Sequence, residues 1–181
     1  MITVIVKLTS GETILARQSY RSNDKITVVD PPFVVSDLIE FNGKLIVAGG
    51  SVGLFEVEGD SYEPLLNQDL LVGKTINDIA IFEGNLLVGT KLSGCFLYDG
   101  KKLLPWQTSI NEELKEHQLN KITLLGENLL GFGTIKNGMY LYNSDSGKYR
   151  ILNRESGLQN NTVLSSLLYK DLLWLGLDNG I

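Results

Sequence analysis

The sequence predicts an all-β fold, a partial β-propeller of about four blades, each blade being a four-stranded antiparallel sheet. Three observations lead to this prediction: glycine pairs recur at nearly constant spacing, short apolar runs alternate with glycine turns, and helical patterning is nearly absent. A repeat of roughly 40 residues is typical of solenoids and propellers. The repeat therefore indicates the fold class before any single strand is assigned.

The glycine pairs define four repeats. The first glycine of each pair follows an apolar run, and the second lies four or five residues later. The first glycines, spaced 40, 44 and 43 residues apart, are Gly49, Gly89, Gly133 and Gly176, and the second glycines are Gly53, Gly94, Gly138 and Gly180. Spacing this regular indicates that one small structural unit is built repeatedly.

Each repeat is expected to form four short strands. An apolar run such as Ile76–Phe82 precedes a polar turn, two strands follow around the glycines, and a fourth strand closes the unit. The fourth strands are expected at 62–65, 103–106 and 149–152, and residues 26–29 hold the equivalent place at the front. Asn-Gly and Asp-Gly turns suit antiparallel hairpins. Four strands in about 43 residues match the size of a propeller blade.

A single propeller fragment is therefore expected over residues 1–181. Its expected parts are a partial blade at 1–30, blades at 33–66, 76–106 and 120–152, and a truncated blade at 162–181. The last repeat ends one residue after Gly180, whereas the other repeats continue into a fourth strand, so we expect the propeller to be truncated. Residues 111–117 carry the one helical pattern and are expected to form a turn or two on the rim.

Composition excludes some classes of protein. Apolar residues make up 43% of the chain, which is enough for a buried core. Asp and Glu outnumber Lys and Arg by 21 to 16, so a nucleic-acid-binding surface is not expected. The single cysteine, Cys95, cannot form an internal disulfide and leaves the redox compartment open. No apolar stretch approaches about 18 residues, so these residues are not expected to form a membrane-spanning helix.

Trp106 is the one candidate ligand-binding residue. It ends a fourth strand beside Pro105 and precedes a long connection. An exposed indole at this place would be a platform for a ligand or a partner, whereas the alternative is that the ring packs in the core. The sequence leaves both possibilities open.

Three other conspicuous residues are interpreted as structural. Trp174 lies two residues before Gly176, where the other repeats have an apolar or small residue, so packing between blades is favoured over stacking on a sugar. Cys95 is expected to be a small apolar filler. His117 is the only histidine and is expected to be solvated in the long connection.

No catalytic, metal-binding or cofactor-binding residue is predicted. The sequence 73–75, Gly-Lys-Thr, resembles the end of a P-loop, but Gln68 stands where a glycine is needed. Residues 131–133, Gly-Phe-Gly, lack the third glycine of a dinucleotide motif. Acidic residues such as Glu112 and Glu113 form no pair that a glycosidase would need. The segment is therefore expected to be non-enzymatic and to hold no cofactor.

Part of the sequence resembles the two-component-regulator propeller repeat. Leu158–Ser166 followed by Leu172–Ile181 is similar to its Gly-Leu-x-x-Asn-x-Val opening, its Leu-Trp-hydrophobic-Gly-Thr strand and its Asn-Gly restart. The Gly-Thr pair is kept at 89–90 and 133–134, and it is absent at 49–50 and 176–177. Over essentially the full chain, the order of segments is similar to the sensor half of propeller-containing transcriptional regulators of Gram-negative bacteria.

The resemblance implies a ligand-sensing segment of a two-component or one-component transcriptional regulator. The parent would carry two N-terminal propellers or one long one, then a triple-tyrosine-type β-sandwich, an inner-membrane span and a cytoplasmic output. The output would be either a histidine kinase with a response regulator or a helix-turn-helix domain. Contact with a membrane is expected only through those other parts of the parent protein. The segment would lie in the periplasm and sense an extracellular small molecule or glycan fragment. The alternative is a protein-protein interaction scaffold or self-association module, because a partial propeller leaves sheet faces uncovered.

Overall fold

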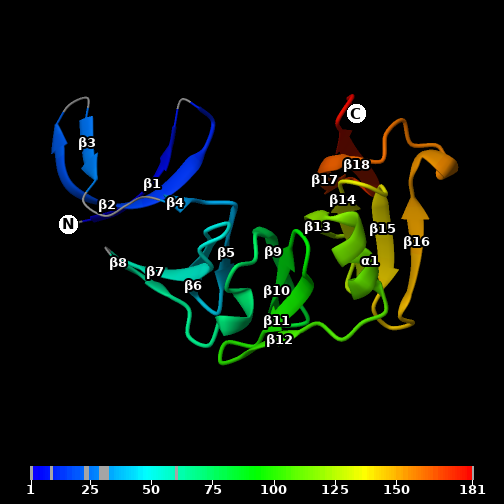
Figure 1. The fold of residues 1–181 in the computed structure, drawn as a ribbon, viewed down its shortest axis with the longest axis horizontal. Helices are drawn as coiled ribbons and strands as arrows, with labels where there is room; N and C mark the ends of the chain where they lie inside the picture. The colour runs from blue at the N-terminus through cyan, green and yellow to red at the C-terminus, as the bar shows by residue number, and fades with distance from the viewer. Residues whose placement is uncertain (1, 9, 23–24, 29–32, 60, 181) are drawn as a thin grey trace. The chain divides into compact units, whose positions relative to one another are not determined.

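The computed structural model describes residues 2–8, 10–22, 25–28, 33–59 and 61–180 (Figure 1). It confirms the predicted fold class, since the chain is all-β and consists mainly of four-stranded antiparallel sheets typical of a partial propeller. The chain forms two compact units, residues 1–76 and 77–181. Each unit is described by itself below.

The first unit begins with a sheet that differs in order from the others. Its strands are β1 (Ile2–Lys7), β2 (Thr13–Ser22), β3 (Lys25–Val28) and β4 (Phe33–Val34). The long β2 pairs with β1 along one edge, whereas on its other edge the start of β2 pairs with β4 and the end pairs with β3. Val29, expected to end a strand, lies outside the described residues. The assignment of residues 1–30 to a blade stays a prediction.

The second sheet of this unit is a four-stranded meander. Its strands are β5 (Asp37–Phe41), β6 (Lys44–Ala48), β7 (Leu54–Glu58) and β8 (Ser61–Pro64), followed by the short helix η1 (Asp69–Leu71). Leu15 of the first sheet and Val47 of the second belong to one buried cluster. The rings of Phe33 and Phe55 stack beside this cluster at a centroid distance of 4.5 Å. The two sheets therefore share a core.

The second unit contains three sheets in chain order. The first is β9 (Ile76–Phe82), β10 (Asn85–Thr90), β11 (Gly94–Tyr98) and β12 (Leu103–Pro105); the second is β13 (Leu119–Leu124), β14 (Leu129–Thr134), β15 (Met139–Asn143) and β16 (Lys148–Leu152); and the third is the pair β17 (Val163–Tyr169) and β18 (Leu172–Leu177). The fourth strands β8, β12 and β16 begin and end within one residue of the positions expected from the repeat.

Hydrogen bonds between neighbouring sheets recur with the repeat. The side-chain Nδ2 of Asn77 donates to the carbonyl oxygen of Leu119 at 2.7 Å, and Nδ2 of Asn120 donates to the carbonyl oxygen of Val163 at 3.0 Å. Both asparagines are near the start of the first strand of their sheet. The same kind of asparagine hydrogen bond therefore connects successive sheets at two equivalent positions of the repeat.

In two of the pairs, the first glycine allows close packing of successive sheets. A Cβ atom on Gly89 would lie 2.7 Å from Cδ2 of Leu119, and one on Gly133 would lie 2.8 Å from Cγ1 of Val163. Leu119 and Val163 begin the first strand of the following sheet. Glycine is used here because it lets a neighbouring strand approach the backbone.

One helix of eight residues, α1 (Ile110–His117), lies in the connection between β12 and β13. Ile110 and Leu114 are fully buried in the core cluster shared by the sheets β9–β12 and β13–β16. The side chain of Asn111 accepts from the backbone N–H of Cys95 at 2.6 Å and donates to the carbonyl of Trp106 at 2.9 Å. The helix was expected on the rim, but one of its faces fills the core. The next connection holds the short helix η2 (Arg154–Ser156).

Candidate functional site

Trp106, the residue that the sequence singled out for binding, lies in the core of the second unit. It is 7% exposed, and its backbone N–H donates to the carbonyl of Cys95 at 2.9 Å. Phe82, Phe132 and Tyr142 contact its ring at centroid distances of 6.0, 5.7 and 5.4 Å. The indole is therefore not an exposed stacking platform. A role of Trp106 in ligand binding stays a prediction.

Trp106 also borders a pocket of about 370 Å³ on the sheet β9–β12. Pockets of this volume are typical of small-molecule sites. The apolar part of the lining is Leu97, Leu104 and Pro105, and the polar part is Asn85, Asp99, Lys102 and Gln107. We name this feature the Trp106 pocket. The sequence offered no signal for it beyond Trp106 itself, because its residues come from β10, β11, β12 and their connections.

Two charged residues of the Trp106 pocket flank the turn between β11 and β12. Oδ1 of Asp99 accepts from the backbone N–H groups of Lys101 and Lys102 at 2.8 and 2.9 Å. The pKa of Asp99 is lowered, first by the hydrogen bond from the N–H of Lys102, then by the one from the N–H of Lys101. The charge of Lys102 lowers it further. The carboxylate therefore stays ionised at neutral pH. Within the described part of the chain, no ion pair engages the Lys102 ammonium.

Cys95 is the filler that the sequence indicated. The side chain is completely buried, and burial, followed by the nearby charge of Asp78, raises the pKa of its thiol. A thiol that is both inaccessible and protonated is a poor nucleophile.

His117 was expected in solvent, but it belongs to a polar cluster. Its Nδ1 lies 2.9 Å from Oη of Tyr140 and 3.1 Å from the carbonyl oxygen of Glu113. Asn137 donates to the same Oη at 2.7 Å, and Oη donates to the Glu113 carboxylate at 3.2 Å. Since the phenol gives its one proton to Glu113, the contact with His117 requires the hydrogen on Nδ1. A possible signal in the sequence was the i,i+4 spacing of Glu113 and His117 on a helical stretch.

This cluster predicts a loss of stability at alkaline pH. Burial, and in addition the charge and hydrogen bond of Glu113, raises the pKa of Tyr140 above its ordinary value of 10.0. The unfolded chain therefore releases this proton at lower pH than the folded chain, so the stabilisation is complete below pH 10 and declines as the pH rises above it. Tyr142 and Tyr149 shift in the same direction.

We expect the free energy of unfolding, measured by urea denaturation from about pH 9 to pH 11, to fall less steeply in Tyr140→Phe than in the unchanged protein. An equally steep fall in both proteins would show that the proton of Tyr140 does not contribute.

Trp174 does not pack between sheets in this structure. It is 49% exposed, which corrects the interpretation made from the repeat. The equivalent face of β9–β12 is covered by the sheet that follows, as the position of Leu87 in the core shows. No described sheet follows β18, so the corresponding face of β17 and β18 is uncovered.

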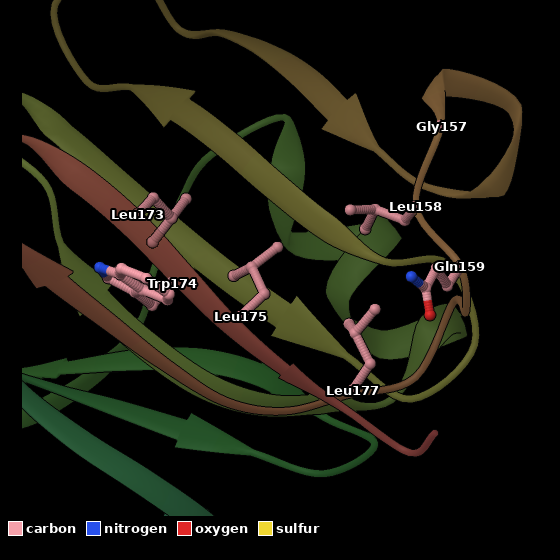
Figure 2. A pocket seen from close by; sticks show the side chains of 7 residues that line it. All are labelled: Gly157, Leu158, Gln159, Leu173, Trp174, Leu175 and Leu177. Atoms are coloured by element: carbon pink, nitrogen blue, oxygen red, sulfur yellow. The ribbon is translucent and has the colours of Figure 1, made fainter. Parts of the chain in front are cut away.

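A groove of about 390 Å³ runs beside β18. Figure 2 shows Leu173, Leu175 and Leu177 along β18, opposite Leu158 and Gln159. In each four-stranded meander the third strand lies beside the second, whereas β18 pairs with β17 alone among the described strands. Its lining is largely leucine, which suits the packing of another protein segment better than a polar ligand.

The remaining sequence motifs do not form sites. Within the ranges that the structure describes, no three His, Cys, Asp or Glu side chains are placed to hold a metal ion. Gly131 and Gly133 lie inside β14, and Gly73 follows η1, so none of them opens a helix that binds phosphate. In the described part of the chain the longest helix has eight residues, which is too short to cross a bilayer.

No protein-family model and no curated protein matches the sequence. Two of the solved structures that match this chain show the similarity in fold. One is described as the extracellular domain of a hybrid two component system, BT4673 from B. thetaiotaomicron, with a TM-score of 0.66 and 24% identity over 80% of this chain and 19% of that chain. The other is described as the extracellular domain of a one component system, BT4673 from the same organism, with a TM-score of 0.66 and 20% identity over 98% of this chain and 21% of that chain.

At these identities the likeness shows the fold. The chain spans about a fifth of the length of the two structures that it matches. Both neighbours are extracellular domains of signalling systems. The fold found here is therefore one that such domains contain.

Proposed function

We propose that this chain is a signal-input segment, on the periplasmic side of the inner membrane, of a bacterial two-component or one-component regulator of transcription. The observation that carries the proposal is the likeness in fold, over 98% of the chain, to an extracellular domain described as part of a one component system. The resemblance of residues 158–181 to the two-component-regulator propeller repeat supports the same function. Sensing by such a segment means that binding of an extracellular small molecule or glycan fragment changes the activity of an output domain.

We further propose that the segment has no catalytic role. The inaccessible, protonated thiol of Cys95 supports this proposal. So does the Trp106 pocket, where a mixture of polar and apolar groups suits binding.

A second candidate function is self-association or the binding of a partner protein. Its support is the uncovered face of β17 and β18, on which Leu167 lies opposite Trp174 and Tyr169 lies opposite Leu172. These four apolar side chains are between 49% and 61% exposed. A second copy or a partner that covered this face would remove a contiguous apolar surface from water. Light scattering tests self-association, because a strictly monomeric chain would contradict it.

The signal-input function is tested with two glycine variants in cells that carry the whole protein. Gly138→Ala places a Cβ against the carbonyl oxygen of Leu152, whereas a Cβ on Gly147 has no atom within 4 Å. We expect Gly138→Ala to change the transcript profile that the regulator controls and Gly147→Ala to leave it unchanged. Equal amounts of protein in the membrane fraction are the control. Identical profiles for both variants, with Gly138→Ala shown to disrupt the segment, would contradict a role in signal input.

A further inference from the structure

The indole N–H of Trp106 is a donor without a protein acceptor. No described residue accepts a hydrogen bond from Nε1, although the side chain is more than nine-tenths buried. Among the described residues, Thr108 Oγ1 is the buried side-chain atom that lacks a partner, so Nε1 of Trp106 retains contact with solvent. Trp106 also lines the Trp106 pocket, so a ligand held there lies next to the indole. A buried tryptophan usually satisfies its N–H, so an open donor suggests a ligand acceptor.

Two opposite charges stand at the same pocket. Asp99 uses Oδ1 for two backbone N–H groups, which leaves Oδ2 able to accept from a ligand. Lys102 also lines the pocket, and its ammonium group has no ion-pair partner in the described part of the chain. Asp99 therefore suits a ligand cation, and Lys102 together with the Trp106 N–H suits a ligand anion.

The rest of the lining is apolar on one side. Leu97 and Leu104 are opposite one another on β11 and β12, and Pro105 follows Leu104. Leu104 is half exposed, so an apolar group placed against it would be removed from water. A sugar is less well suited, because Phe82, Phe132 and Tyr142 already surround the aromatic ring on which it would stack.

We propose that the Trp106 pocket binds a small zwitterionic molecule with an apolar substituent, of the class of aliphatic α-amino acids. The ligand ammonium contacts Asp99, its carboxylate contacts Lys102 and the Trp106 N–H, and its aliphatic group contacts Leu97 and Leu104. This inference deepens the proposed signal-input function, and it rests on that function for the role of the ligand as a signal. Binding itself is measured on the isolated chain, so its failure leaves signal input untouched.

Isothermal titration of the 181-residue chain with L-leucine tests the proposal. N-acetyl-leucine lacks the ammonium charge, and leucinamide lacks the carboxylate. We expect L-leucine to bind and each blocked compound to bind about tenfold or more weakly, because each loses one charge-assisted contact. Maltose serves as a saccharide probe and is expected not to bind at this pocket.

Three variants locate the binding. Asp99→Asn keeps an oxygen for the turn N–H groups and removes the charge, and Lys102→Gln removes the opposite charge; each is expected to weaken L-leucine binding about tenfold. Trp106→Phe keeps an aromatic ring and removes the N–H, with an expected loss of about threefold to tenfold. Lys101→Gln alters the same turn outside the pocket lining and is expected to bind as the unchanged protein does.

The proposal is overturned if L-leucine does not bind, if the blocked compounds bind equally well, or if Asp99→Asn and Lys102→Gln retain full affinity. If maltose binds and Asp99→Asn or Lys102→Gln weakens its binding, the assignment of a zwitterionic ligand is also overturned. Circular dichroism and urea denaturation of each variant establish that the fold is retained. Where a variant unfolds, the comparison of L-leucine with its two blocked analogues on the unchanged chain provides the test.

Discussion

Gly138→Ala is expected to destabilise the second unit by about 3 to 5 kcal/mol. Gly138 has a φ of +74°, and the new Cβ would meet the carbonyl oxygen of Leu152 and lie 3.0 Å from Cα of Asn153. Both obstacles are backbone atoms, so a rotamer change cannot relieve the contact. The N–H of Gly138 also donates to the carbonyl of Asn161 at 2.7 Å, and moving this turn would break that bond.

Gly147→Ala is the matched control. Gly147 has a similar φ of +65°, but a Cβ there meets no atom within 4 Å. Its expected cost is only that of the left-handed backbone, about 1 kcal/mol. Urea denaturation followed by tryptophan fluorescence measures both variants. Equal destabilisation of the two would mean that the backbone contact at Gly138 is not what requires glycine.

Asp78→Ala is expected to destabilise the protein by about 3 kcal/mol. The Asp78 side chain is 3% exposed and connects two sheets, because Oδ1 lies 2.7 Å from Nζ of Lys121 and Oδ2 accepts from the N–H of Ile122 at 2.6 Å. Alanine leaves the N–H of Ile122 without this acceptor and Lys121 without its counter-charge. The Lys121 side chain is 36% exposed, and access to water keeps the cost at the lower end for a broken buried pair.

The exposed ion pair of α1 gives the comparison for Asp78. Lys115 contacts Glu112 at 2.5 Å, and the Glu112 side chain is 80% exposed. Glu112→Gln is expected to change the free energy of unfolding by less than about 0.5 kcal/mol, because water screens such a pair. Urea denaturation at neutral pH measures both. If Asp78→Ala cost no more than Glu112→Gln, the contacts of Asp78 would not hold the sheets together.

Much of the fold could be predicted from local patterns in the sequence. Gly89 and Gly133 recur because a strand of the next sheet approaches the backbone there, so glycine spacing reported the repeating sheet directly. The strand Ile76–Phe82 was predicted with the bounds that β9 has, because alternation and turn residues act over a few neighbours. The order of the first sheet could not be predicted, since the pairing of the long β2 with two strands on one edge depends on contacts distant in sequence.

The surroundings of several single side chains could not be predicted from the repeat. Trp106 and Trp174 both occupy apolar stretches, yet one is 7% exposed and the other 49%. His117 was expected in solvent, and contact with Tyr140 across 23 residues places it in a cluster. Each outcome depends on which sheet or helix covers the residue, and a repeat pattern does not contain that information.

By itself, then, the sequence determined the repeating four-stranded sheet, its strands and turns, and the burial of Cys95. Backbone conformation and the alternation of side chains are set by neighbouring residues, so they can be predicted from a single sequence. Only the tertiary structure decided that the ring of Trp106 is enclosed in the core and that Trp106, Asp99 and Lys102 line one pocket. That arrangement requires the sheets to pack, because packing determines which polar groups lose water and which keep it.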